Sequence, residues 1–208
     1  MPGRLIVSDH PLVQEKLALL RDRRTTPAGF RCAMETASAL MGCEALRGLR
    51  TKVRSVPTPL KRARAVALDQ SITLVAVLRA GLGMLGGLLD LAPAARIGHI
   101  GLYRNEETLN PVRYYVRLPP DLKDSFLVLC DPMLATGGSA AEALRIVKTD
   151  GARQIALLCI IASRAGVRRV HSAHPDVPIY TAGLDPRLDR KGYILPGLGD
   201  AGDRLFAT

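Results

Sequence analysis

Three uninterrupted apolar runs constrain the fold of this chain more than any other feature; they are residues 72–78, 126–130 and 155–161. Apolar runs of this length, without polar alternation, are typical of strands buried on both faces of a parallel sheet. Between the last two runs, Ala143, Leu144 and Val147 have helical spacing, and Asp150-Gly151 closes the helix in the usual way. This is a β-α-β unit of the expected length. We therefore predict an α/β fold with an open, mostly parallel sheet flanked by helices.

Further elements are expected on both sides of this centre. Residues 11–24 have helical spacing, and Thr26-Pro27 is typical of a helix start that leads into apolar positions as far as Met41. Residues 53–59 contain two prolines and are expected to be extended or looped. Residues 97–103 and 114–118 are predicted strands around a polar tip, 104–111.

The length and composition favour one domain over residues 1–208. The chain has 208 residues, of which 48% are hydrophobic, and this is enough to bury a core without metal or disulfide support. Within the domain we expect an N-terminal helical arm at about 9–50, a β-hairpin at about 97–118 and a C-terminal segment at about 183–208.

The cysteines and the ends of the chain indicate the cellular compartment. The four cysteines have no C-x-x-C spacing, so neither a zinc site nor a disulfide is expected; they are Cys32, Cys43, Cys130 and Cys159. No segment resembles a signal peptide, and none reaches the roughly 18 apolar residues of a membrane helix. We predict a soluble cytoplasmic protein.

The net charge of +10 is concentrated between residues 47 and 64. This basic stretch carries Arg47, Arg50, Lys52, Arg54, Lys61, Arg62 and Arg64. Such a face can bind RNA or another polyanion, or it can be a solvated surface. No aromatic residue lies within it for bases to stack on, and we favour the solvated surface.

The strongest chemical signal follows the second apolar run. An acid, Asp131, ends the predicted strand, and Thr136-Gly137-Gly138-Ser139 opens the next helix. Free N–H groups and the positive end of a helix dipole bind anions at such a position, and glycines let a phosphate approach the backbone. The spacing is neither a Walker loop nor a dinucleotide fingerprint. A plain helix cap is the alternative interpretation.

The segment D-P-M-L-A-T-G-G-S, residues 131–139, resembles the phosphoribosyl-pyrophosphate (PRPP) loop of type I phosphoribosyltransferases, in the form found in the uracil phosphoribosyltransferase family. Three other segments are similar to that family: L-R-A-G-L-G-M at 78–84, G-L-Y-R-N-E-E-T-L at 101–109 and G-Y-I-L-P-G-L-G-D-A-G-D at 192–203. The resemblance extends from about residue 8 to the last residue. The chain departs from the family at 162–166, where A-S-R-A-G stands in place of A-A-P-E-G, and at 48–57, where the family tends to have acids.

The resemblance implies a type I phosphoribosyltransferase fold and a set of residues that bind PRPP. Asp200, Arg104 and Arg79 would be the catalytic residues, with Arg104 on a β-hairpin lid that closes over the pyrophosphate. The predicted PRPP site comprises Arg79, Arg104, Asp131, Pro132, Met133, Leu134, Ala135, Thr136, Gly137, Gly138, Ser139 and Asp200. Magnesium would bind mainly through PRPP, and no residue is assigned as a direct metal ligand.

The resemblance also implies a base site in the C-terminal segment. Uracil would be bound by Tyr193, Ile194, Gly199, Asp200 and Ala201, largely through main-chain groups. The reaction would convert uracil and PRPP to UMP and diphosphate in pyrimidine salvage. Family members form homodimers or homotetramers, and some are activated by GTP, so GTP is a possible effector here.

The alternative hypothesis is an RNA-binding pyrimidine regulator on the same fold, with little or no transferase activity. It would use the basic stretch at 47–64. The phosphate loop and the C-terminal segment favour the enzyme, and nucleic acid or membrane partners are not expected.

Overall fold

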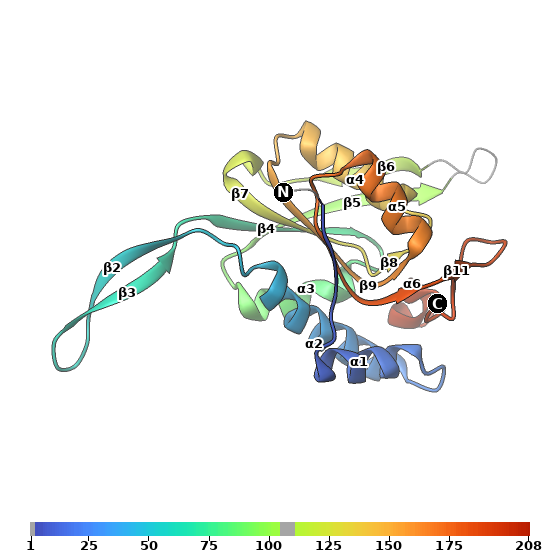
Figure 1. Cartoon of the computed structure of the whole chain (residues 1–208), viewed down its shortest axis with the longest axis horizontal. Helices are drawn as coiled ribbons and strands as arrows, with labels where there is room; N and C mark the ends of the chain where they lie inside the picture. Colours follow the sequence, from blue (N-terminus) through green and yellow to red (C-terminus); the bar gives the residue numbers. More distant parts are fainter. Residues whose placement is uncertain (1–2, 105–110) are drawn as a thin grey trace.

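The structure, a computed structural model, describes residues 3–104 and 111–208. Its centre is an eight-stranded sheet in the order β1-β10-β9-β7-β4-β5-β6, with β8 beside β9 (Figure 1). The strands are β1 (Leu5–Val7), β4 (Ser71–Leu78), β5 (Arg96–Arg104), β6 (Pro111–Arg117), β7 (Ser125–Cys130), β8 (Met133–Leu134), β9 (Gln154–Ser163) and β10 (Ile179–Asp185). Strand β6 is antiparallel to β5, whereas the other pairs are parallel. The predicted mostly parallel sheet is confirmed.

Helices cover both faces of the sheet (Figure 1). One face carries α1 (Pro11–Arg21), α2 (Pro27–Ala45), α3 (Leu82–Leu91) and α6 (Ala201–Phe206), and the other carries α4 (Gly138–Thr149) and α5 (Arg164–Ala173). Successive residues of β4 point alternately to the two layers. Leu74 and Ala76 pack in the core with α1, α2 and α3, whereas Val75 and Val77 pack in the core with α4 and α5. A largely apolar run is therefore expected here, because both faces of the strand are buried, and the hydroxyl of the one polar residue in 72–78, Thr73, forms a hydrogen bond with that of Ser125 at 2.7 Å.

The start of α2 follows the predicted capping pattern. The Thr26 hydroxyl accepts a hydrogen bond from the Gly29 N–H at 3.2 Å, and Pro27 occupies the first turn, where no intrahelical donor is needed. Phe30 and Met34, one and two turns into the helix, are fully buried. The cap thus fixes where the buried face of α2 begins.

One hairpin was not expected from the sequence. Strands β2 (Thr51–Pro57) and β3 (Arg62–Leu68) pair with each other and project from the body of the protein (Figure 1). The sequence predicts an extended or looped segment at 53–59, and this segment is extended as far as Pro57. Its partner strand was not predicted, although residues 62–68 alternate between larger exposed side chains and half-buried alanines, which is the period of a strand. The basic stretch therefore lies largely on this hairpin, with its arginine and lysine side chains exposed.

The structure has no disulfide bond at any of its cysteines. Cys32 and Cys43 are exposed thiols, and Cys130 and Cys159 are buried in strands. Burial raises the pKa of the Cys159 thiol to about 12, so this thiol is neutral at physiological pH. The expectation that Cys130 and Cys159 are small buried residues of the core is confirmed.

Within the described residues, no helix is both long and apolar enough to cross a membrane.

The contact between α2 and α3 yields a stability prediction. A Cβ added at Gly87 would overlap the main-chain carbonyl of Glu35 on α2, whereas a Cβ at Gly48 would meet nothing within 4 Å. Alanine normally favours a helix over glycine, so any loss at position 87 must come from the clash. We expect Gly87→Ala to lower the free energy of unfolding by about 1–3 kcal/mol, and Gly48→Ala to change it by less than about 0.5 kcal/mol. Urea denaturation of both variants measures this, and equal stability of the two would contradict the tight packing of these helices.

Candidate active site

A cavity of about 300 Å³ lies at the carboxyl ends of the central strands. Leu78 and Leu102 line it from the ends of β4 and β5, and Asp131 follows the last residue of β7. The loop from Met133 to Ala140 forms a second wall, and Asp200 and Gly202 approach from the C-terminal segment. This is where ligands bind in open α/β sheets.

The loop between β7 and α4 has the geometry of an anion site. Gly137 adopts φ +77°, and the twelve-residue helix α4 begins at Gly138. Residues 136–140 line the cavity, so the N–H groups of the first turn of α4 belong to the cavity wall. These N–H groups have no intrahelical acceptor, and the helix dipole adds partial positive charge. The loop is therefore prepared for a phosphate.

Helix α5 supports this loop from beneath. The Ser163 hydroxyl donates to the Ala135 carbonyl at 2.5 Å and accepts the Gly166 N–H at 2.9 Å, which makes Ser163 the N-cap of α5. A Cβ at Gly137 would lie 2.7 Å from the Gly166 carbonyl oxygen, so the loop and the helix are in backbone contact. The departure from the family pattern at 162–166 thus forms a capped helix start that supports the phosphate loop.

Asp131 is an acid in an unfavourable environment. Burial raises the pKa of its carboxyl to about 7, and the hydrogen bond that the carboxyl accepts from the Met133 N–H, at 3.4 Å, opposes this only weakly. A half-buried carboxyl with a strongly raised pKa in a cavity is a typical sign of a functional position. In this structure the group lies where it could accept hydrogen bonds from a ligand.

A second, smaller cavity of about 230 Å³ adjoins the first. Its own lining comes from the C-terminal segment: Gly192, Tyr193, Ile194, Gly199 and Ala201. It shares Ala80, Asp131, Met133, Ala135, Asp200 and Gly202 with the larger cavity. The two cavities therefore form one two-part site, with the carboxylates of Asp131 and Asp200 where the parts meet.

Asp200 and Arg79 are linked through the short helix α6. The Asp200 carboxylate accepts the Asp203 N–H at 3.0 Å and so caps this helix. The Arg79 guanidinium lies 3.5 Å from the Asp203 carboxylate and 5.7 Å from the centre of the Phe206 ring. Both members of the Arg79–Asp203 pair are more than half exposed, so the pair is weak and leaves Arg79 available to a ligand.

Most residues predicted to bind the substrates lie in the two cavities, with two exceptions. The exceptions are Pro132, which lines neither cavity and whose carbonyl accepts the Ile160 and Ile161 N–H groups of β9, and Arg104. The Arg104 side chain and residues 105–110 lie outside the described part of the chain, so the lid stays a prediction. Ala80 and Gly202 line both cavities and were not predicted, although both lie inside motifs that the sequence analysis identified.

Comparison with known proteins gives a consistent result. The chain matches the family model described as "Uracil phosphoribosyltransferase" over residues 7–208. Proteins named uracil phosphoribosyltransferase from Bacillus cereus (strain B4264) and Bacillus anthracis (strain A0248) are each 50% identical to it over 207 residues, covering 99% of both chains.

Solved structures agree with this match. The AQ2163 protein from Aquifex aeolicus superimposes with a TM-score of 0.93 at 37% identity, covering 98% of both chains. Hypoxanthine phosphoribosyltransferase from Trypanosoma cruzi shares the fold alone, with a TM-score of 0.50 at 14% identity, covering 78% of this chain and 71% of that one.

The raised pKa of Asp131 predicts how stability depends on pH. An ordinary aspartate in the unfolded chain loses its proton near pH 4, but the folded protein keeps this one until about pH 7. Stability should therefore fall as pH rises between these values. Asparagine carries no charge, so we expect Asp131→Asn to be more stable than the parent at pH 8, by a few kcal/mol at most, and to lose this advantage towards pH 4.

Urea denaturation of the unliganded proteins measures the effect at about pH 4, the lower end of this window, and at about pH 8, above its upper end. Asp90→Asn is the control, because Asp90 is exposed on α3 and lines neither cavity. A stability difference for Asp131→Asn that is the same at both pH values would contradict the prediction.

Proposed function

Since the chain belongs to the uracil phosphoribosyltransferase family, we propose that it transfers the phosphoribosyl group of PRPP to uracil, giving UMP and diphosphate. The protein is an enzyme of the pentosyltransferase class. The observation that carries the proposal is the two-part site, in which a phosphate loop and a small base-sized cavity meet at Asp131 and Asp200.

In this proposal the larger cavity binds PRPP. The N–H groups and hydroxyls from Thr136 to Ser139 hold the 5-phosphate at the start of α4. Asp131 accepts hydrogen bonds from the ribose hydroxyls, and Arg79, at the end of β4, contacts the diphosphate with its forked donors. Arg104 is predicted to join it from the lid.

The chemistry is a displacement at the anomeric carbon. N1 of uracil forms a bond to C1 of the ribose and gives up its proton, while the bond from C1 to the diphosphate oxygen breaks and the electron pair leaves with diphosphate. Positive charge develops on the sugar and negative charge on the leaving group. Fixed donors such as the Arg79 guanidinium stabilise that negative charge, and holding both substrates in adjoining cavities supplies the orientation. No covalent intermediate with the protein is needed.

The donor set fits a magnesium ion that is bound chiefly by substrate. Two carboxylates, those of Asp131 and Asp200, line the larger cavity, and the described residues include no group of three or more metal-binding side chains. Magnesium is commonly held by one or two carboxylates together with substrate phosphates. Asp131 and Asp200 would hold such an ion with PRPP, and it would supply charge neutralisation for the departing diphosphate.

The smaller cavity would bind the base through main-chain groups. Gly199 adopts φ +80°, which favours glycine, and with Ala201 it presents little side-chain bulk. The main-chain groups of Ile194, Gly199 and Ala201 can therefore match the alternating donor and acceptor edge of uracil. The exposed Tyr193 forms the rim.

Several finer assignments stay predictions from the resemblance. These are a role in pyrimidine salvage, a cytoplasmic location, activation by GTP and assembly into homodimers or homotetramers. An RNA-binding regulator stays the alternative, and the exposed basic hairpin β2–β3 is the feature that favours it.

One pair of assays tests the proposed function. UMP formation from uracil and PRPP, followed with and without magnesium, should show turnover that requires the metal. RNA binding should be measured beside it over a range of salt concentrations, because binding to a basic surface weakens steeply with salt. No UMP formation together with specific RNA binding would overturn the enzyme in favour of the regulator.

A substitution at Asp200 tests whether its negative charge is needed for catalysis. Asparagine caps a helix about as well as aspartate, so Asp200→Asn should keep the hydrogen bond to the Asp203 N–H and leave the melting temperature unchanged. It removes the negative charge that would face the metal-bound substrate. We expect turnover to fall by at least about a hundredfold, equivalent to roughly 2.7 kcal/mol, as measured by steady-state kinetics. Near-normal turnover in a folded variant would exclude Asp200 from catalysis.

Base selectivity follows from main-chain recognition. When cytosine or hypoxanthine enters, buried main-chain donors or acceptors lose their partners, and each lost partner costs about 1–3 kcal/mol. We therefore expect kcat/KM for uracil to exceed that for either competitor by at least about a hundredfold, which corresponds to two such mismatches. Parallel assays with the three bases measure this, and similar values would show that the edge of the base is not being recognised.

A further inference from the structure

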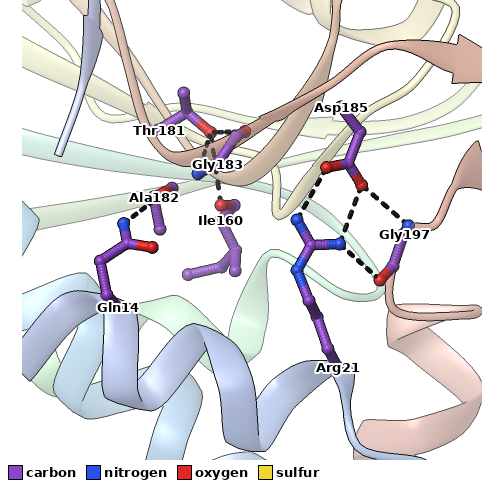
Figure 2. A network of polar contacts seen from close by, with 8 residues as sticks. All are labelled: Gln14, Arg21, Ile160, Thr181, Ala182, Gly183, Asp185 and Gly197. Atoms are coloured by element: carbon purple, nitrogen blue, oxygen red, sulfur yellow. Dashed lines mark hydrogen bonds and ion pairs between the residues drawn. The ribbon is translucent and has the colours of Figure 1, made fainter. Parts of the chain in front are cut away.

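We propose that Arg21 and Asp185 are positioning residues for uracil, acting through the main chain of Gly197. The inference rests on the proposed function and extends it to two residues that line neither cavity. Figure 2 shows the arrangement, in which the guanidinium of Arg21, from α1, meets both the carboxylate of Asp185 and the turn at Gly197.

The contact between Arg21 and Asp185 is a forked ion pair. The two terminal nitrogens of Arg21 donate to the two carboxylate oxygens of Asp185, at 2.9 and 2.7 Å. The Asp185 side chain is 7% exposed and that of Arg21 is 28% exposed, so water does little to weaken the pair. Burial by itself would raise the pKa of Asp185, but the hydrogen bonds from Arg21 and from the Gly197 N–H hold the pKa below its usual range. The carboxylate therefore stays ionised at neutral pH.

Gly197 is held from both sides by this pair. Its N–H donates to the Asp185 carboxylate at 2.8 Å, and its carbonyl accepts a hydrogen bond from Arg21 at 2.8 Å (Figure 2). Both polar groups of one residue are thus tied to one ion pair. The position is also restricted to glycine, because φ is +64° and a Cβ would overlap the Ile194 carbonyl.

This turn lies at the centre of the base-binding segment. Gly197 separates Ile194 from Gly199, and both of these residues line the smaller cavity. Shifting Gly197 therefore shifts the main-chain groups on either side of it. A site that recognises a base with main-chain groups has no flexible side chain to absorb an error, and productive geometry must hold to about 0.5 Å.

Both anchors belong to rigid elements. Asp185 is the last residue of β10, in register with Ser163 of β9, and Arg21 is the last residue of α1. The position of the turn at Gly197 is thus fixed relative to the end of the sheet and to helix α1. The same β9 residue, Ser163, also contacts the phosphate loop, so the loop and the turn at Gly197 are both attached to the ends of the neighbouring strands β9 and β10.

A second arginine, Arg204, holds the C-terminal segment at Leu198, the residue after Gly197. Arg204 donates to the Leu198 carbonyl at 2.9 Å and to the Asp22 carbonyl at 2.6 Å, and it also contacts the Leu20 carbonyl. Its guanidinium lies 4.3 Å from the centre of the Phe30 ring. Since the contacts of Arg204 are separate from those of Arg21, the segment should stay attached when the Arg21 fork is weakened. A change at Arg21 then alters placement more than folding.

The test uses Arg21→Lys in the full chain. Lysine keeps the charge but cannot hold both Asp185 oxygens and the Gly197 carbonyl with a planar fork. We expect kcat/KM for uracil to fall by about tenfold, a loss comparable to one charge-assisted hydrogen bond, while KM for PRPP stays within about twofold. Asp185→Asn should give the same split, because it removes the charge and one acceptor.

Arg24→Lys is the matched control. Arg24 lies on the surface just after the end of α1 and makes a similar forked contact with Asp22, at 3.1 and 2.8 Å. It lines neither cavity. It should leave both kinetic constants unchanged. All assays are run well below the melting temperature of each variant, which is measured separately.

The outcomes separate the hypotheses. A parent protein that forms no UMP removes the proposed function itself. If the parent is active, unchanged uracil kinetics in Arg21→Lys and Asp185→Asn, with or without a lower melting temperature, overturn the positioning role and leave a purely structural ion pair. An equal loss for uracil and PRPP overturns it as well, because the whole site would then be disturbed.

Discussion

The ion pair between Arg21 and Asp185 joins parts of the chain that are 164 residues apart, and the geometry of the C-terminal segment depends on it. The loop after β10 is partly anchored by buried apolar residues, Ile194, Leu198, Ala201 and Leu205, and the ion pair adds a fixed position for the turn at Gly197. Held in this way, the loop forms one wall of a cavity whose other walls are the ends of β4 and β7. The N-terminal helices therefore do more than cover one face of the sheet, because residues at the end of α1 hold the C-terminal segment in place.

The ionised form of one cavity residue, Asp131, is disfavoured by its surroundings. Asp131 is half-buried, accepts one weak hydrogen bond from the described residues and has a raised pKa, whereas Asp185 is buried more completely and has its pKa held low by Arg21 and Gly197. The structural acid has its partners within the protein. The acid in the cavity lacks them, as expected for a group that meets its partners only when a ligand binds.

The sequence could predict those parts of the protein whose structure is determined by residues close together in the chain. The run at 72–78 indicated a strand buried on both faces, and Thr26-Pro27 indicated a helix start, because each pattern depends on neighbours along the chain. The loop from Asp131 to Ser139, which lines the larger cavity except at Pro132, was identified for the same reason. The extended course of 53–57 was one of two alternatives, but its pairing with 62–68 was not predicted, because two prolines obscured the limits of the hairpin. The pairing of Arg21 with Asp185 could not be predicted, since any of the chain's many arginines could have met that carboxylate and only the folded arrangement selects one.

The projecting hairpin has a consequence for how this protein behaves in a crowded solution. A two-stranded ribbon that stands apart from its sheet has two open edges, each a row of main-chain groups able to pair with a strand from another molecule. Val53, Leu60 and Val66 are exposed on it and would favour such stacking. The arginines and lysines of the same ribbon oppose it, because two like-charged edges repel at low ionic strength. Salt shortens the reach of that repulsion to about 3 Å at 1 M, so pairing between the edges of two such ribbons should become easier as salt is added.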